Sequence, residues 1–491
     1  MSSDNSRVPN SRRWVRVLIA FLVAFDVAAL FQWADGAFQS EFGGHADEAE
    51  NFLAALRTRD ALVHAPDRGS ASAENPDVQQ RGRRRGFSHA LGAWMAVFGT
   101  SRIAALLFMS ALAAATTALI FYSVQRESGM WAATAASLLW LCAPAVRESF
   151  ETLLPEQSGA LILTGAALLW ARMMEGGNLR RTSAPKWIGM AALFGIAAVL
   201  AYAGAQLLKI VPGNPRAAGV FLRECVSVLG IAATAFAITG AVLRRRSDPQ
   251  GGPVRAAMLA LVAGVLFARW MKADVVDSRV IIVATPALAI LAARGALALA
   301  EFVGSQALAP VVALRRRVLW IFLLLLLALP MDLLHAWHKD WRGFGAIALT
   351  LVEESQGPAR VLVVSDPRGE RMLCSEVAMH DRARQITIER GSETLVESRG
   401  NDPRAKPQER FDEDQELLAY LTSGRIQYMV LDSAVPYETH AGYHDQVRRV
   451  IEDNVRNFWP THDSVIIRDG ELQGRPLKIY RVILPDRIGL P

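Results

Sequence analysis

Nine apolar runs with few or no charges dominate this sequence of 491 residues. Each run can cross a hydrocarbon core about 30 Å thick as a helix that rises about 1.5 Å per residue. A backbone inside a bilayer must satisfy its own polar groups, which favours helices for all of them. We therefore expect transmembrane helices at 14–33, 102–123, 130–146, 158–174, 187–208, 218–243, 254–270, 279–299 and 317–337.

The basic residues indicate the orientation of these helices. The chain has a net charge of +6, and its Lys and Arg side chains cluster between the apolar runs, as at Arg244–Arg246 and Arg315–Arg317. Such clusters mark cytoplasmic loops, which predicts a cytoplasmic N-terminus and an extracytoplasmic C-terminus in the inner (cell) membrane. Arg81–Arg85 lies in the first outer loop and fits this orientation least well, although long loops translocate largely regardless of charge. The charge thus predicts membrane lipids as partners, and no nucleic acid.

Beyond the last run, the composition becomes charged and mixed. Val361–Ser365 and Gln427–Leu431 read as buried strands, and Ser464–Arg468 with Lys478–Ile483 read as a hairpin. Helix-compatible stretches at 370–380, 413–422 and 443–456 alternate with these strands, which predicts a small α/β domain with a largely parallel sheet. We expect a polytopic helical domain over residues 1–338 and an extracytoplasmic α/β domain over 339–491.

Acidic side chains in the first two outer loops are the candidate catalytic residues. Asp47 and Glu48 are adjacent carboxylates, and Glu156 comes just before the fourth apolar run. A carboxylate near the membrane surface can act as a general base that takes a proton from an acceptor hydroxyl. Both positions also fit a plain helix start, with Asp47 as the cap and acids in the first turn.

Cationic side chains near the predicted outer ends of helices are candidate ligands for a lipid phosphate. Arg binds phosphate in a bidentate manner, and snorkelling to lipid headgroups is the alternative interpretation of each residue. No metal-ligand spacing is present, so no cofactor is expected and a divalent metal is not indicated. The candidate phosphate ligands are His89, Arg102, Arg147, Lys272 and Arg279.

Several short motifs, in this order, carry a resemblance to a known family. They are Asp47-Glu48-Ala49, Ser88-His89-Ala90-Leu91, Phe98-Gly99-Thr100-Ser101-Arg102, Ala143-Pro144, Pro155-Glu156, Asp277-Ser278-Arg279 and Ala284-Thr285-Pro286. Over residues 14–337 the chain resembles membrane glycosyltransferases of the GT-C fold, in particular bacterial relatives of the dolichyl-phosphate-mannose protein mannosyltransferases (family 39-like).

The resemblance implies an inverting transfer of a hexosyl or pentosyl group from a polyprenyl-phosphate donor to a glycan, lipid or protein acceptor. It implies that Asp47 is the catalytic base and that Glu156 helps to form the site. Two other functions stay open: a transporter or flippase for a lipid-linked or small solute, and a non-catalytic membrane scaffold of the same fold.

Overall fold

The computed structural model describes residues 10–45, 47–64, 85–175, 217–242, 252–271, 279–304, 339–355, 357–397, 408–468 and 471–483. The chain divides into two compact units. The helical unit contains Met1–Gln32 and Leu107–Trp337, and the α/β unit contains Trp33–Leu106 and His338–Pro491. The sequence predicted a boundary at the same place near residue 338, but it assigned residues 33–106 to the membrane domain, whereas the structure groups them with the C-terminal residues.

Within the part of the chain that the structure describes, helices lie along most of the predicted apolar runs. Among the described residues, three stretches are long and apolar enough to cross a membrane: Arg13–Ala34, Arg102–Ser128 and Ile281–Leu299. The predicted spans at 187–208 and 317–337 lie outside the described residues. The helices are α1 (Asn10–Ala34), α4 (Arg102–Ser128), α5 (Met130–Leu141), α6 (Pro144–Phe150), α7 (Glu156–Glu175), α9 (Ala217–Val242), α10 (Gly252–Met271) and α11 (Val280–Gly304).

The run at 130–146 forms two short helices instead of the single predicted span. Helix α5 ends at Leu141, and Pro144 opens α6. Ala143 is extended, with φ −64° and ψ 126°, because the proline ring that follows disfavours a helical conformation at the preceding residue. The 12 residues of α5 rise only about 18 Å, which is shorter than a bilayer core.

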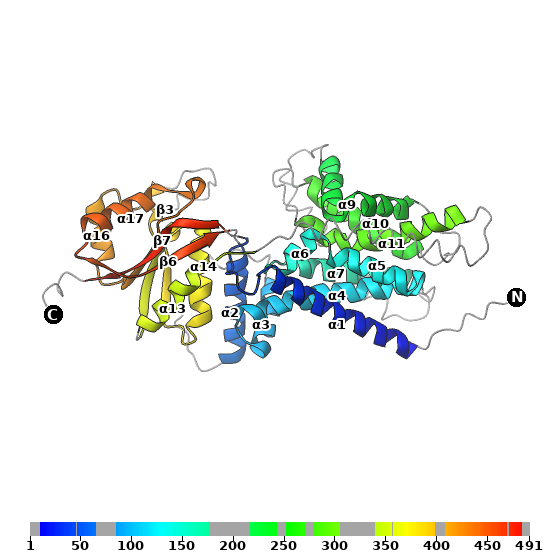
Figure 1. The fold of residues 1–491 in the computed structure, drawn as a ribbon, viewed down its shortest axis with the longest axis horizontal. Helices are drawn as coiled ribbons and strands as arrows, with labels where there is room; N and C mark the ends of the chain where they lie inside the picture. Colours follow the sequence, from blue (N-terminus) through cyan, green and yellow to red (C-terminus); the bar gives the residue numbers. More distant parts are fainter. Residues whose placement is uncertain are drawn as a thin grey trace. The chain divides into compact units, whose positions relative to one another are not determined.

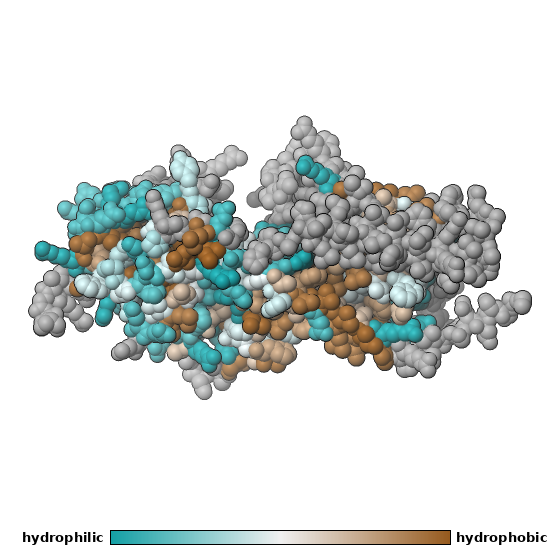
Figure 2. Space-filling model, viewed as in Figure 1, coloured by the Kyte–Doolittle hydropathy of each residue, from teal (hydrophilic) through white to brown (hydrophobic). Residues whose placement is uncertain are grey.

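Helix α1 carries a broad apolar surface. Trp14, Leu18 and Leu22 are each more than half exposed, and Figure 2 shows apolar residues along this helix. A continuous exposed apolar surface of this kind is unfavourable in water and suits contact with lipid. By contrast, α11 is buried and approaches α9 closely, because Gly240 and Gly295 leave no side chain between the two backbones.

The α/β unit contains a five-stranded sheet with the order β2-β1-β5-β7-β6. β1 (Ala359–Val364) pairs in parallel with β2 (Ile386–Arg390) and β5 (Tyr428–Asp432), while β7 (Glu471–Val482) pairs antiparallel with β5 and β6 (Phe458–Arg468). The predicted strands near 361 and 427 and the predicted hairpin are confirmed. The sheet is mixed rather than largely parallel, because β7 pairs antiparallel with both of its neighbours, β5 and β6.

Helices cover both faces of this sheet, as Figure 1 shows. α13 (Phe344–Glu354) and α14 (Pro367–His380) pack on the face that includes Val361 and Val363. α16 (Asp414–Leu421) and α17 (Gly442–Asp453) pack on the face that includes Leu362 and Val364. Alternate residues of β1 therefore fill two separate cores. The remaining short elements are α15 (Gly391–Thr394), β3 (Val396–Glu397), β4 (Gln408–Glu409) and the 3₁₀ turn η3 (Tyr437–Thr439).

Residues from the first predicted outer loop complete this unit with two helices, α2 (Glu48–His64) and α3 (Arg85–Phe98). The second of these helices is amphipathic. Phe87, Leu91 and Met95 form its buried stripe at a spacing of four residues. A side chain at Gly92 would collide with the Ala55 carbonyl, so this glycine permits the close approach of α2 and α3.

Candidate functional site

The two adjacent carboxylates at the start of α2 differ in their surroundings. Glu48 is fully buried, and its Oε1 accepts a hydrogen bond from Lys339 Nζ in an ion pair whose two side chains are 0% exposed. Asp47 is only partly buried and directly precedes α2, where its carbonyl accepts a hydrogen bond from Asn51 N at 2.9 Å. Asp47 therefore occupies the cap position of a helix, and of the two carboxylates it is the more accessible.

Lys339 also contacts the segment that leads to these carboxylates. Its backbone N–H donates to the Asp35 carbonyl at 2.9 Å, and its Nζ lies 5.7 Å from the centroid of the Phe42 ring. Phe42 is itself buried and packs against Phe52 of α2, with ring centroids 4.8 Å apart. Lys339 thus contacts the segment 35–48 at its beginning, middle and end.

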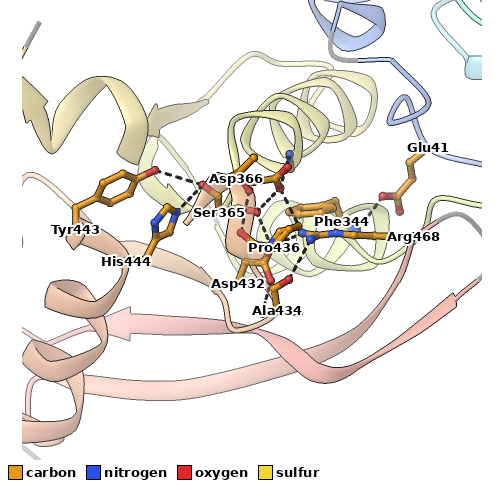
Figure 3. Close-up of polar contacts among 12 residues, drawn as sticks. Glu41, Phe344, Ser365, Asp366, Asp432, Ala434, Pro436, Tyr443, His444 and Arg468 are labelled. Atoms are coloured by element: carbon orange, nitrogen blue, oxygen red, sulfur yellow. Dashed lines mark hydrogen bonds and ion pairs between the residues drawn. The ribbon is translucent and has the colours of Figure 1, made fainter. Parts of the chain in front are cut away.

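The Glu41 side chain accepts hydrogen bonds from the backbone N–H groups at the N-terminus of α13. Its carboxylate accepts hydrogen bonds from the backbone N–H groups of Gly343 (2.9 Å), Phe344 (3.1 Å) and Gly345 (2.7 Å). Figure 3 shows Glu41 directed toward Phe344. Burial raises the pKa of Glu41 to about 7, the nearby Glu376 adds to the rise, and the backbone donors oppose it. An acidic side chain at a helix N-terminus is a standard stabilising arrangement. This contact attaches the segment 35–48 to the start of α13.

Arg102 is engaged within the same unit. Its Nη2 donates to Glu376 Oε1 at 2.6 Å, and its Nη1 donates to the Gln39 carbonyl at 3.2 Å. Burial raises the pKa of Glu376, while Arg102 opposes this rise. His380 also lies near this carboxylate, with its Nε2 4.0 Å from Glu376 Oε2. Arg102, predicted to bind a donor phosphate, therefore serves an ion pair that joins the start of α4 to α14.

The remaining predicted site residues are divided between the units. His89 is exposed on α3 of the α/β unit. In the helical unit, Arg147 Nε lies 3.5 Å from Glu151 Oε1, and Arg147 Cζ lies 4.5 Å from the Phe31 ring centroid.

Glu156 and Arg279 are both half-buried in the helical unit. Glu156 is the first residue of α7, and Arg279 directly precedes α11, where its carbonyl accepts from Ile282 N at 3.1 Å. Lys272 lies outside the described residues. The structure brings Asp47, Glu48, His89 and Arg102 into one unit and Arg147, Glu156 and Arg279 into the other.

A second polar cluster lies at the carboxyl ends of β1 and β5 (Figure 3). Asp432 Oδ2 accepts from both Ser365 Oγ and Arg468 Nη2 at 2.6 Å, and the same Nη2 lies 3.3 Å from Asp366 Oδ1. Arg468 Nη1 donates to the Ala434 carbonyl at 3.0 Å. Parallel α/β sheets bind ligands at this edge, where the connections of neighbouring strands diverge. In this protein the Arg468 guanidinium occupies the place where a ligand would bind, and it links the ends of β1 and β5. This arrangement indicates a structural role for Arg468.

The side chains that attach the segment 35–48 to the rest of the α/β unit were not identified from the sequence. Glu41, Lys339 and Glu376 each make buried polar contacts across the discontinuous parts of the α/β unit. The only sequence signal was the place of Lys339 just beyond the last apolar run. Within the described residues, no group of three or more His, Cys, Asp or Glu side chains could hold a metal ion.

No protein-family model and no curated protein sequence matches this chain.

Proposed function

We propose that the chain is an inverting membrane glycosyltransferase with nine transmembrane helices, which uses a polyprenyl-phosphate sugar at the outer face of the membrane. Asp47 is the general base in this proposal. The observation that carries the assignment is the contrast between the two adjacent acids, since Glu48 is buried against Lys339 while Asp47 is partly exposed at the start of α2. A general base needs both access to its substrate and a fixed position.

The proposed reaction is a direct displacement. The acceptor hydroxyl oxygen attacks the anomeric carbon from the face opposite the phosphate, and a new glycosidic bond forms as the carbon–oxygen bond to phosphate breaks. Asp47 takes the hydroxyl proton, the polyprenyl phosphate leaves with the bonding electron pair, and the anomeric configuration inverts. Glu48 holds the segment that contains the base rather than taking the proton.

The donor phosphate requires cationic ligands, and the proposed ones are His89, Arg102, Arg147, Lys272 and Arg279. His89 is exposed on α3, and Arg279 is half-buried and directly precedes α11. An arginine guanidinium can donate two parallel hydrogen bonds to phosphate oxygens, which suits Arg to this role.

The test compares Asp47→Asn with Glu50→Gln, a matched change in the first turn of the same helix. Membranes that contain each full-length variant supply the acceptors and receive radiolabelled polyprenyl-phosphate mannose, glucose, galactose or arabinose. Loss of a general base lowers the rate by about 100-fold or more, so Asp47→Asn is expected to lose transfer while Glu50→Gln retains it.

Three results would reject this proposal. Transfer at the wild-type rate by a folded Asp47→Asn protein would exclude Asp47 as the base. Passage of an intact lipid-linked sugar across proteoliposomes, with no glycosyl transfer from any of the four donors, would favour a transporter. A scaffold would instead tolerate replacement of both Asp47 and Glu156 while failing when residues 340–491 are deleted.

A further inference from the structure

The contacts of Lys339 carry an inference that rests on the proposed function. We propose that Lys339 is a positioning residue for Asp47, acting through Glu48 and the segment 35–48. Its backbone N–H bonds the Asp35 carbonyl at 2.9 Å, and its Nζ bonds the Glu48 carboxylate. Asp47 therefore lies one residue from a side chain whose place Lys339 determines.

Burial makes this attachment strong. Neither Lys339 nor Glu48 has any side-chain exposure, so each charge depends on the other for compensation. Removal of one member leaves an isolated charge in the interior, which is far less favourable than the pair. The Phe42 ring lies 5.7 Å from Nζ and adds a cation–π contact. Lys339 consequently holds the end of the segment nearest Asp47, while Glu41 attaches the same segment to the N-terminus of α13.

A fixed segment matters for a base, because a displacement of about 1 Å can lower a reaction rate by about 100-fold. Lys339 also controls the electrostatics near Asp47. It neutralises the Glu48 carboxylate, and without it an uncompensated negative charge would lie on the adjacent residue. That charge would favour the protonated form of Asp47 and so raise the pH needed to generate the base.

The test compares the full-length variants Lys339→Met and Lys339→Arg with Lys478→Met. Lys478 lies in β7 and provides the matched control. The first measurement is the rate of sugar transfer from the donor that the wild-type protein uses, as a function of pH and donor concentration. For Lys339→Met we expect kcat to fall by about 10- to 100-fold with little change in KM, because the base is displaced and the donor site is not.

The pH profile separates positioning from general destabilisation. Lys339→Met should move the acidic limb of the rate profile to higher pH, since Glu48 is left uncompensated. Glu48→Gln should move it to lower pH, since the Lys339 charge is then unopposed. Lys339→Arg keeps the charge and should retain more activity than Lys339→Met. If Lys339→Met does not fold, the opposite shift in Glu48→Gln still tests the inference.

Hydrogen exchange of the same proteins provides a readout independent of activity. In Lys339→Met, exchange should accelerate at the amides of 35–51 and stay unchanged in β1 and β5. Equal acceleration throughout the unit, or unchanged exchange with unchanged kcat, would overturn the inference. If the wild-type protein transfers no sugar, the proposed function fails and the catalytic role of Lys339 fails with it, whereas normal wild-type transfer with an unaffected Lys339→Met rejects the positioning role alone.

Discussion

The Arg102 guanidinium donates to the Glu376 carboxylate at 2.6 Å, and this contact joins residues separated by 274 positions in the chain. Glu376 is fully buried, whereas the Arg102 side chain is 18% exposed. Breaking a buried pair on one side costs about 3–5 kcal/mol, because the remaining charge is left in the interior. Partial exposure of Arg102 places the expected cost at the lower end of this range.

A double-mutant cycle tests this pair. Arg102→Leu should lower the free energy of unfolding of the α/β unit by about 3 kcal/mol, and Arg102→Leu with Glu376→Gln should recover part of that loss. Denaturant unfolding followed by Trp fluorescence measures the change, with Trp341 as the buried reporter in this unit. Additive effects of the two substitutions would contradict a direct interaction.

The stability of the α/β unit should fall as pH rises from about 4.5 to about 7. Burial raises the pKa of Glu41 and of Glu370 from 4.5 to about 7, so the folded state holds protons in this window that the unfolded state has released. Each such group contributes stability that is fully present below pH 4.5 and is lost as pH passes through 7, with a slope of up to about 1.4 kcal/mol per pH unit.

Glu41→Gln tests this pH dependence. The amide cannot ionise, and its oxygen can still accept from the N-terminal amides of α13, so the slope of stability against pH should become smaller. Thermal unfolding midpoints between pH 4.5 and 8 provide the measurement, with Glu50→Gln as the control. An unchanged slope in Glu41→Gln would show that Glu41 is ionised throughout this range in the folded protein.

Gly345 should not tolerate a side chain. A Cβ at this position would lie 3.0 Å from Glu41 Oε1 and 3.3 Å from Glu376 Oε2. We expect Gly345→Ala to destabilise the unit by about 1–3 kcal/mol, because it displaces two buried carboxylates. Gly357→Ala is the matched control, since no atom lies within 4 Å of its added Cβ. Equal unfolding midpoints for the two variants would show that the Glu41 and Glu376 side chains can move aside without loss of stability.

Arg468→Met should be among the most destabilising substitutions in the sheet. It leaves the Asp366 and Asp432 side chains, which are 11% and 0% exposed, without their cation, at a cost of about 3–5 kcal/mol. Arg360→Met removes an ion pair to Glu389 in which Arg360 is 54% exposed, and it should cost about 1 kcal/mol or less. Denaturant midpoints compare the two, and a similar loss in both would argue against a structural role for the Arg468 network.

Local patterns in the sequence predicted much of the fold. The apolar runs locate helices such as α4 and α11, because burial or contact with lipid requires continuous apolar sequence. The strand at β1 reads directly from Val361–Ser365. The hairpin of β6 and β7 was also visible, since its strands adjoin in sequence. β2 was missed, because its residues Ile386–Arg390 mix β-branched and charged side chains within five positions.

The contacts of the candidate site were much harder to predict. Asp47 and Glu48 were located from the sequence, but the partner of Glu48 is 291 residues away, and no periodicity or motif reports such a pairing. The contact between Glu41 and the N-terminus of α13 could not be predicted for the same reason, since these residues are also far apart in the sequence. Arg102 was identified as a candidate ligand because it begins a helix, a position that equally suits an ion pair with a distant acid.

The discontinuous α/β unit has a consequence for biosynthesis. Residues 33–106 emerge from the ribosome long before residues 338–491, yet both segments form one compact unit. Because folding during synthesis proceeds from the N-terminus, Glu41 and Glu48 must remain without Lys339 and the α13 amides until the helices between them have been made. Closure of this unit therefore marks the moment when the intervening helices have been synthesised, and a chain that stalls before residue 339 leaves residues 33–106 without their C-terminal partners.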